Sequence, residues 1–188
     1  MPATPAPSPK KRADAARNRE KILSTARATF GGGAPVSMAE VARRAGVGMA
    51  TLYRNFPSRR ELLEALYVEE VDAICAAAEA LPGDTPGEAL MAWVRRFVEF
   101  IANKHEIASE LLEQTDRANP VFDGSRARVL AAGQPLLDAA QQSGEVRDDL
   151  SLEQVLDLVL AASSIRGDAD YRGPIVRAAL DGIRRPSG

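Results

Sequence analysis

The side chains best suited to chemistry in this 188-residue chain are basic and lie near its start. Residues 1–60 contain 12 lysines and arginines but only three acidic residues, which gives a formal charge of +9. Residues 61–188 contain 12 basic and 23 acidic residues, a charge of −11, so the whole chain carries −2. A basic block joined to an acidic body indicates that one end binds a polyanion such as nucleic acid. A solvated basic face without a partner is the plainer alternative.

Residues suited to catalysis or metal binding are scarce by comparison. The chain has one histidine, His105, and one cysteine, Cys75. These are too few for a thiolate cluster, a histidine-rich metal site or an internal disulfide, and they leave little for a Ser-His-Asp relay. We therefore expect no metal, no cofactor and no enzymatic activity. Cys75 is interpreted as a small buried hydrophobic residue rather than a sensor thiol.

Composition places the chain among ordinary globular proteins, with 45% hydrophobic and 27% charged residues. No apolar run approaches the roughly 18–20 residues of a membrane span. The first residues, MPATPAPSPKKR, lack the apolar region of a secretory signal. We expect a cytoplasmic protein with no membrane partner.

Helix start and stop signals predict an all-α chain. Four Ser or Thr residues precede a Glu or Gln by three positions, which is capping-box spacing: the hydroxyl caps the first turn, and the Glu or Gln side chain reaches back to the helix start. Glycines follow several apolar stripes. The four pairs are Ser37/Glu40, Ser58/Glu61, Thr85/Glu88 and Ser151/Gln154. Residues 1–13, rich in proline, are expected to form a disordered basic arm. A kink or break is expected at Pro135. Nine helices are expected, at residues 14–30, 38–45, 49–55, 59–80, 86–103, 104–116, 123–142, 152–166 and 172–184.

The stretch 38–56, MAEVARRAGVGMATLYRNF, has the pattern of two short helices joined by a tight turn. Met38 and Val41 form the buried stripe of the first helix, Gly46 closes the turn, and Leu52 anchors the second helix. This arrangement is typical of a helix-turn-helix, whose second helix enters the major groove of DNA.

An ordered set of motifs extends this pattern over about residues 17–66, and it resembles the TetR (tetracycline-repressor) family. The departures are an arginine where the family often has lysine at position 59, and a looser glycine-rich turn at 31–35. A phosphate loop at that turn is disfavoured because no Gly-Lys-Ser/Thr follows. Residues 144–150 also resemble a segment common in the family. The motifs are Ile22-Leu-x-x-Ala26-x-x-x-Phe30, Val41-Ala42-x-x-Ala45-Gly46-Val47, Thr51-Leu52-Tyr53-x-x-Phe56 and Ser58-Arg59-x-x-Leu62-Leu63.

The resemblance implies a ligand-responsive, sequence-specific DNA-binding regulator. It would be a repressor, released from a palindromic operator by a small molecule. Residues 14–60 would form a three-helix DNA-binding domain, and residues 61–188 would form the effector-binding and dimerisation domain. The expected partners are a double-stranded DNA operator, a second copy of the chain and an unidentified small-molecule effector.

Basic and polar residues around the second short helix are the expected DNA contacts. Tyr53 would contact a phosphate, as the resemblance implies, or pack at a surface edge. Arg54 would read a guanine edge or bind phosphate. The basic residues at 10–12 would reach a minor groove or form a solubilising tail. The full set is Ser37, Arg43, Arg44, Met49, Ala50, Thr51, Tyr53, Arg54, Arg59, Lys10, Lys11 and Arg12.

Apolar residues of the body supply two further expected sites. The resemblance implies an effector pocket, for which the candidates are Trp93, Phe97, Phe100, His105, Leu111, Leu112, Val129 and Leu136. An ordinary core stripe is the alternative for the aromatic residues. The helix at 152–166 has two apolar stripes, which indicates burial against its own core and against a partner. The expected dimer residues are Leu152, Val155, Leu158, Val159, Ala162, Ile165, Ile175, Val176, Ala179 and Leu180.

One alternative to the regulator belongs to a different class of protein. It is a helical small-molecule carrier, or an enzyme, whose N-terminal helices mediate protein contacts. The acidic residues of the body lack metal-ligand spacing, and a carrier has no evident use for a charge of +9 in its first 60 residues. Both observations favour the regulator.

Overall fold

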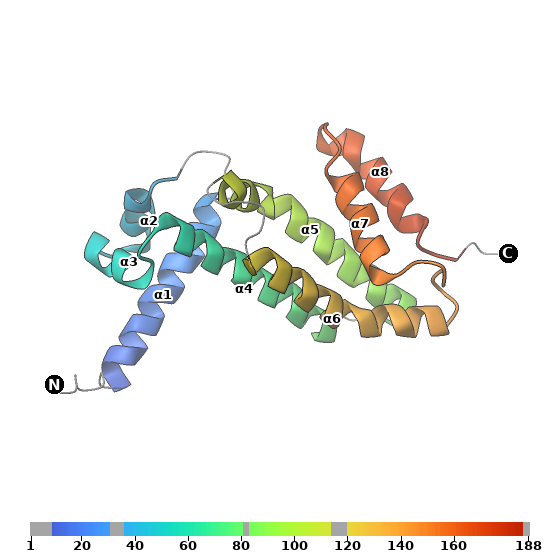
Figure 1. The fold of residues 1–188 in the computed structure, drawn as a ribbon, viewed down its shortest axis with the longest axis horizontal. Coiled ribbons are helices and arrows are strands. Elements are labelled where there is room, and N and C mark those ends of the chain that lie inside the picture. Colours follow the sequence, from blue (N-terminus) through green and yellow to red (C-terminus); the bar gives the residue numbers. More distant parts are fainter. Residues whose placement is uncertain (1–8, 31–35, 81–82, 114–119, 186–188) are drawn as a thin grey trace. The chain divides into compact units, whose positions relative to one another are not determined.

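The computed structural model describes the backbone of residues 9–30, 36–80, 83–113 and 120–185. Within these ranges, side chains are not described at residues 9–12, 102–110, 112–113, 120–121 and 123. The described chain is all-helical apart from turns and one isolated β-bridge. Its helices (Figure 1) are α1 Pro9–Phe30, α2 Met38–Ala45, α3 Met49–Asn55, α4 Arg59–Ala80, α5 Pro86–Glu113, α6 Pro120–Gln142, α7 Leu152–Ser163 and α8 Ala169–Asp181.

The all-α prediction is confirmed, with eight helices in the described ranges instead of nine. The helices expected at 86–103 and 104–116 form the single helix α5, because no glycine or proline interrupts the chain between them. A kink or break was expected at Pro135; α6 continues through this residue, so the helix is not broken there. Both Pro135 and Ala131, whose carbonyl loses its helical donor, are exposed, so water can satisfy that carbonyl.

The start of α1 also differs from the prediction. The helix begins at Pro9, so residues 9–13, expected in a disordered arm, are helical. Proline suits the first position of a helix because its missing N–H has no helical acceptor there. Residues 1–8 lie outside the described part of the chain.

Several helix ends are capped as the sequence predicts. The hydroxyl of Ser151 accepts from the Gln154 N–H, and the Gln154 side chain accepts from the Ser151 N–H, which completes a capping box. The Ser37 hydroxyl accepts from the Glu40 N–H at 3.2 Å. The Ser58 hydroxyl accepts from the Glu61 N–H at 3.2 Å. These bonds satisfy N–H groups that the first helical turn leaves without partners.

The chain divides into two compact units. Unit 1 comprises Met1–Tyr67 and Glu106–Thr115, and unit 2 comprises Val68–His105 and Asp116–Gly188. In unit 1, α1 packs against α2 and α3, and α2 packs against α3. The core of this unit contains the predicted stripe of α1 and the inward residues of both short helices. Its buried members include Ile22, Leu23, Ala26, Phe30, Val41, Ala42, Leu52, Phe56, Leu62 and Leu63.

Unit 2 is built around Trp93, the single tryptophan of the chain, which is fully buried. Its indole N–H donates to the main-chain carbonyl of Ile74 in α4 at 3.0 Å. A Cβ atom at Gly133 in α6 would lie 2.3 Å from the Trp93 ring, so only glycine fits at this position. One side chain thus fixes the packing of α4, α5 and α6 within this unit. Elsewhere in unit 2, α7 packs against α6 and α8.

Candidate nucleic-acid interface

The turn between α2 and α3 depends on Gly46. This residue has φ of +66°, a left-handed conformation that glycine adopts without steric cost. Its N–H donates to the Arg43 carbonyl at 3.3 Å, and the Val47 N–H donates to the Ala42 carbonyl at 3.0 Å. These bonds end α2 as in the common helix C-cap and set the direction in which the chain enters α3.

Helix α3 is anchored by the side chain of Leu52, which is fully buried. Gly48 precedes the helix in an extended conformation, and its carbonyl accepts from the N–H groups of Thr51 and Leu52 at 2.9 and 3.0 Å. A helix of seven residues with one buried anchor presents its remaining side chains outward. The sequence-predicted helix-turn-helix geometry is therefore present in unit 1.

The outer face of α3 carries the predicted base and phosphate contacts. Met49 and Tyr53 are 40% and 45% exposed, and Ala50 and Arg54 are also exposed. Thr51 is half-buried, and its carbonyl accepts from the Asn55 side chain at 2.8 Å. The structure thus brings the five predicted α3 residues together on one short helix. This surface combines a guanidinium, a phenol and apolar atoms, the groups that contact base edges and phosphates.

Arg43 and Arg44, the predicted contacts on α2, both pair with Glu40. Arg43 donates through Nε and Nη2 to the two carboxylate oxygens of Glu40, at 2.9 and 2.7 Å. Arg44 donates through Nε at 2.6 Å. Hydrogen bonds from Arg43 and then Arg44 lower the pKa of Glu40 to about 2. In the capping-box prediction Glu40 reaches back to the helix start, but here its carboxylate holds two arginines.

Arg59 is engaged inside unit 1. Its guanidinium donates to the Val36 carbonyl and lies 4.9 Å above the centre of the Phe30 ring. This half-buried arginine therefore joins the start of α4 to the end of α1. Lys10, Lys11 and Arg12 belong to α1, and their side chains lie outside the described part of the structure.

The residues predicted for the effector pocket whose side chains are described fall in both units. Trp93 and Val129 are buried in the core of unit 2, whereas Leu111 is buried in unit 1. Phe97, Phe100 and Leu136 are half-buried in unit 2. The three aromatic rings form a row along α5, with centroids 6.3 Å apart between Trp93 and Phe97 and 5.8 Å apart between Phe97 and Phe100. The side chains of His105 and Leu112 are not described.

A small space does lie beside this row, lined by Phe100 and residues of α4 and α5. Its volume is about 40 Å³. A drug-sized ligand takes roughly 300–1,000 Å³. In this conformation the space holds little more than one water molecule.

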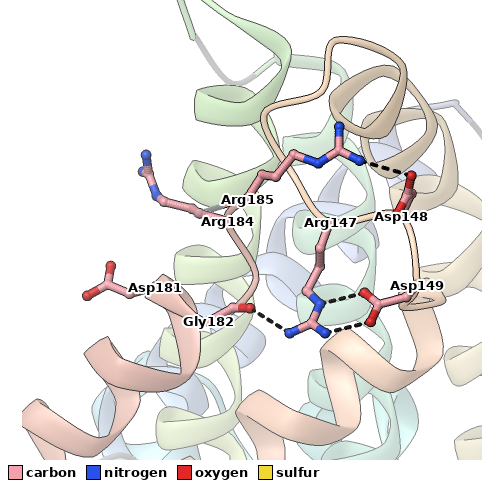
Figure 2. A pocket seen from close by; sticks show the side chains of 7 residues that line it. All are labelled: Arg147, Asp148, Asp149, Asp181, Gly182, Arg184 and Arg185. Carbon is pink, nitrogen blue, oxygen red and sulfur yellow. Dashed lines mark hydrogen bonds and ion pairs between the residues drawn. The ribbon is translucent and has the colours of Figure 1, made fainter. Parts of the chain in front are cut away.

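A larger depression, which the candidate residues do not include, lies where the segment after α6 meets the end of the described chain. It has a volume of about 600 Å³ (Figure 2). Arg147 donates to both carboxylate oxygens of Asp149 at 2.5 Å and to the Gly182 carbonyl at 3.3 Å. Arg185 donates to Asp148 at 3.2 Å. The sequence signal for this feature was the family-like segment 144–150.

The charges around this depression balance, with three arginines and three aspartates in its wall. Main-chain hydrogen bonds also join the same two segments, from Arg147 N–H to the Ile183 carbonyl and from Arg185 N–H to the Glu145 carbonyl, at 3.1 and 3.0 Å. Both sets of bonds hold the end of the described chain against the segment after α6. We therefore assign the charged residues a structural role.

The predicted dimer residues fall into two groups. Buried within unit 2 are Leu152, Val155, Val159, Ala162 and Leu180. Exposed or half-buried are Leu158, Ile165, Ile175, Val176 and Ala179. Leu158 and Ile165, seven residues apart, are 40% and 37% exposed, and Tyr171 of α8 is 61% exposed. Leu158 lies on α7 and Ile165 follows the last residue of that helix, Ser163, so large apolar side chains on and just after α7 are in contact with solvent.

Two further observations concern membrane-spanning helices and metal sites. None of the helices in the described ranges combines the length and the apolar character that a membrane span requires. Over the same residues, no group of three or more His, Cys, Asp and Glu side chains is placed to hold a metal ion.

Comparisons with known proteins match both parts of the chain. Residues 22–66 match the model of bacterial regulatory proteins of the tetR family. Residues 85–185 match the model of the C-terminal domain of SbtR-like transcriptional regulators. The two matches cover the helix-turn-helix and most of the body, including the depression after α6.

Solved structures and named relatives agree with these matches. A TetR transcription regulatory protein from Mycobacterium vanbaalenii is 36% identical with a TM-score of 0.73, covering 93% of this chain and 99% of that one. A TetR transcriptional regulator from Streptomyces coelicolor is 33% identical with a TM-score of 0.70, covering 90% and 99%. The HTH-type transcriptional repressor KstR of Rhodococcus jostii is 26% identical over 182 residues, which cover 89% of this chain and 85% of the repressor.

The motifs of unit 1, the exposed face of α3 and these matches all agree. The chain belongs to the TetR family of transcriptional regulators, and it is a DNA-binding transcriptional regulator.

Proposed function

We propose that this protein is a homodimeric repressor that reads a palindromic operator with α3 and leaves it when a small molecule binds unit 2. The observation that carries the proposal is the outer face of α3, where Met49, Tyr53 and Arg54 are exposed around the buried anchor Leu52. Relatives named as transcriptional repressors support the direction of control.

On the operator, α3 lies in the major groove. Arg54 contacts a guanine edge or a phosphate, Tyr53 donates to a phosphate, and Met49 contacts a thymine methyl group. Two copies of α3 about 34–36 Å apart, one turn of DNA, would read the two half-sites. Membership of a family of operator-binding dimeric regulators supports this arrangement.

The dimer interface proposed here is the solvent-facing stripe of α7 together with α8. Leu158 of α7 and Ile165, two residues after the end of that helix, supply large exposed apolar side chains, and Ile175, Val176 and Ala179 of α8 are half-buried. Burial of this surface against a second copy would remove apolar area from water.

The effector site is proposed beside the aromatic row of α5. Phe97, Phe100 and Leu136 are half-buried and have surface to offer a ligand, whereas Trp93 and Val129 are closed within the core. Because the adjoining space is only about 40 Å³, a ligand would have to stabilise a wider conformation. Its differential affinity for the two conformations limits how far it can release DNA.

The experiment that tests the proposal is fluorescence anisotropy on duplexes selected by the protein from a random-sequence pool. Arg54→Ala is expected to weaken binding by about 1–3 kcal/mol, the usual value for a base-edge contact. Tyr53→Phe, which removes only the hydroxyl, is expected to weaken it by about 0.5–1.5 kcal/mol. Arg95→Ala, an exposed position on α5 in unit 2, is the matched control for the loss of an arginine. Unchanged affinity in both α3 variants would refute the placement of α3 in the groove.

A further inference from the structure

The ion-pair cluster on α2 has a feature that the DNA-binding role of its arginines does not explain. One carboxylate, that of Glu40, receives three hydrogen bonds from two arginines, at 2.6 to 2.9 Å. The side chains of Arg43 and Arg44 are 70% and 51% exposed, so both would otherwise be available to an approaching phosphate. Instead, the two positive charges nearest the turn share a negative partner three or four residues away.

Glu40 is not needed in this position to close the start of α2. The Ser37 hydroxyl already caps the helix by accepting the Glu40 N–H. The carboxylate lies instead along the helix, on the side of the arginines. Its pKa of about 2, lowered first by the hydrogen bonds from Arg43, keeps it charged throughout the physiological range.

Phosphates and Glu40 compete for the same guanidinium groups. An exposed ion pair contributes only about 0–1 kcal/mol, so DNA can displace it. A guanidinium that already has a carboxylate partner nevertheless contributes less binding free energy when it contacts a phosphate than an unpaired guanidinium does. Glu40 also repels any phosphate that approaches the pair.

The effect of this competition depends on how the protein docks. On random DNA, binding derives almost entirely from Lys and Arg contacts to phosphates. The protein can then change its orientation on the DNA so that as many Lys and Arg side chains as possible contact phosphates. On an operator, base contacts from α3 set the orientation, so the gain from additional phosphates is restricted. Removing the competitor therefore favours random DNA more than the operator.

We propose that Glu40 is a specificity-determining residue, which lowers the affinity of unit 1 for non-operator DNA by occupying Arg43 and Arg44. This inference rests on the proposed function, since it presupposes that α3 recognises an operator. The ligand whose binding Glu40 weakens is the phosphate backbone of duplex DNA, whatever its sequence.

The test compares Glu40→Gln with Glu20→Gln by fluorescence anisotropy across a salt series. Glu20 is an exposed residue of α1 in the same unit, so both substitutions remove one negative charge. The probes are a duplex selected by the wild-type protein from a random pool and a scrambled duplex of the same length and composition. Glutamine keeps the size of residue 40 and leaves the Ser37 cap in place.

Glu40→Gln is expected to tighten binding to the scrambled duplex roughly tenfold at low salt, the equivalent of two released exposed pairs. Binding to the selected duplex should tighten by no more than about twofold, because α3 already sets the docking there. The salt slope on the scrambled duplex should steepen by up to about 1.8, or about 0.9 for each added phosphate contact. The triple variant Glu40→Gln/Arg43→Ala/Arg44→Ala should not show this tighter binding to the scrambled duplex.

Equal effects of Glu40→Gln and Glu20→Gln would overturn the proposal, because net charge alone would then account for the change. The same gain on both duplexes would also overturn it, because Glu40 would then oppose all DNA without selecting. Failure of the proposed function is seen in the wild-type protein alone, as the absence of any sequence enriched from the pool.

Discussion

Units 1 and 2 use different means to hold their defining side chains. In unit 1, the turn glycine, the anchor Leu52 and the exposed residues of α3 all lie within about ten residues of one another in the sequence. In unit 2, the Trp93 indole N–H donates to the carbonyl of Ile74 in one helix, and the ring fills the space left by Gly133 in another. A local motif sets the geometry of the first unit, whereas contacts distant in sequence set that of the second.

The same contrast holds for charge. Glu40 of unit 1 pairs with arginines one turn away on its own helix. Glu145 of unit 2 accepts hydrogen bonds from Thr85, far away in sequence, and from Ser143. The charged pairs of Glu40 in unit 1 thus lie on the surface of one helix, whereas Glu145 in unit 2 joins segments that are far apart in the sequence. Substitutions should accordingly affect DNA binding mainly in unit 1 and folding mainly in unit 2.

The largest effect is expected from Trp93→Ala. Loss of a fully buried indole should lower the free energy of unfolding by about 3–5 kcal/mol. Urea unfolding followed by circular dichroism would measure it. Trp93→Phe, which keeps most of the ring but not the N–H, should cost clearly less. Equal costs for the two variants would mean that the ring does not fill the centre of unit 2.

Leu52→Ala should cost about 2–5 kcal/mol, because it removes the anchor of α3. DNA binding should be lost with it, while the fluorescence of Trp93 in unit 2 keeps the emission of a buried indole. Anisotropy and the tryptophan emission spectrum would measure the two effects. A variant that retains operator affinity would show that α3 does not depend on this anchor.

Gly133→Ala should destabilise the protein by about 1–3 kcal/mol, since its new Cβ would overlap the Trp93 ring. The matched control is Gly124→Ala in the same helix, where a Cβ meets no atom within 4 Å. That substitution should stabilise α6 by about 0.5–1 kcal/mol through helix propensity. Thermal unfolding of both variants gives the comparison, and a shift of the same sign in both would contradict it.

Ser37→Ala should cost about 1 kcal/mol, the usual value of a helix N-cap. Ser151→Ala, at the capping box of α7, should have a similar effect on stability. If the two units differ in role as proposed, only Ser37→Ala should also weaken operator binding. Chemical denaturation and anisotropy on the same samples separate the two readouts.

The smallest effect concerns acid stability. The pKa of Glu40 is lowered to about 2 by its arginines, and the pKa of Glu145 is lowered by hydrogen bonds from Thr85 and Ser143. A carboxyl whose pKa is lower in the folded state stabilises the protein above its unfolded pKa of 4.5, and this stability is lost as the pH falls through the folded pKa.

Glu40→Gln and Glu145→Gln should therefore each reduce the fall in melting temperature below pH 4.5. Melting curves at a series of acidic pH values would show the reduction. A fall as steep as that of the wild-type protein in both variants would show that neither carboxyl contributes.

Much of unit 1 could be predicted because its signals are local. The buried stripe of α1, the glycine at 46 and the inward Leu52 all appear in the structure as expected. The predictions for Glu40 and Arg59 were incomplete, because the sequence does not show which of several possible partners each side chain takes. The pairing of Glu40 with both arginines, and of Arg59 with Val36 and Phe30, depends on side-chain positions in the folded unit.

Less of unit 2 could be predicted. An aromatic stripe at helical spacing has the same pattern whether it lines a pocket or fills a core, and here Trp93 fills the core. Two apolar stripes were visible in the sequence of residues 152–166, but the packing of α6 and α8 against α7 decided which of their members, such as Leu158, remain exposed.

The sequence alone therefore determined the all-helical class, the positions of most helix ends and the helix-turn-helix, because caps, glycines and apolar periodicity act over one or two turns. Tertiary structure decided that Gly133 makes room for Trp93 and that Arg59 contacts Val36 and Phe30. These features depend on distances between side chains, and those distances are set only when the helices pack.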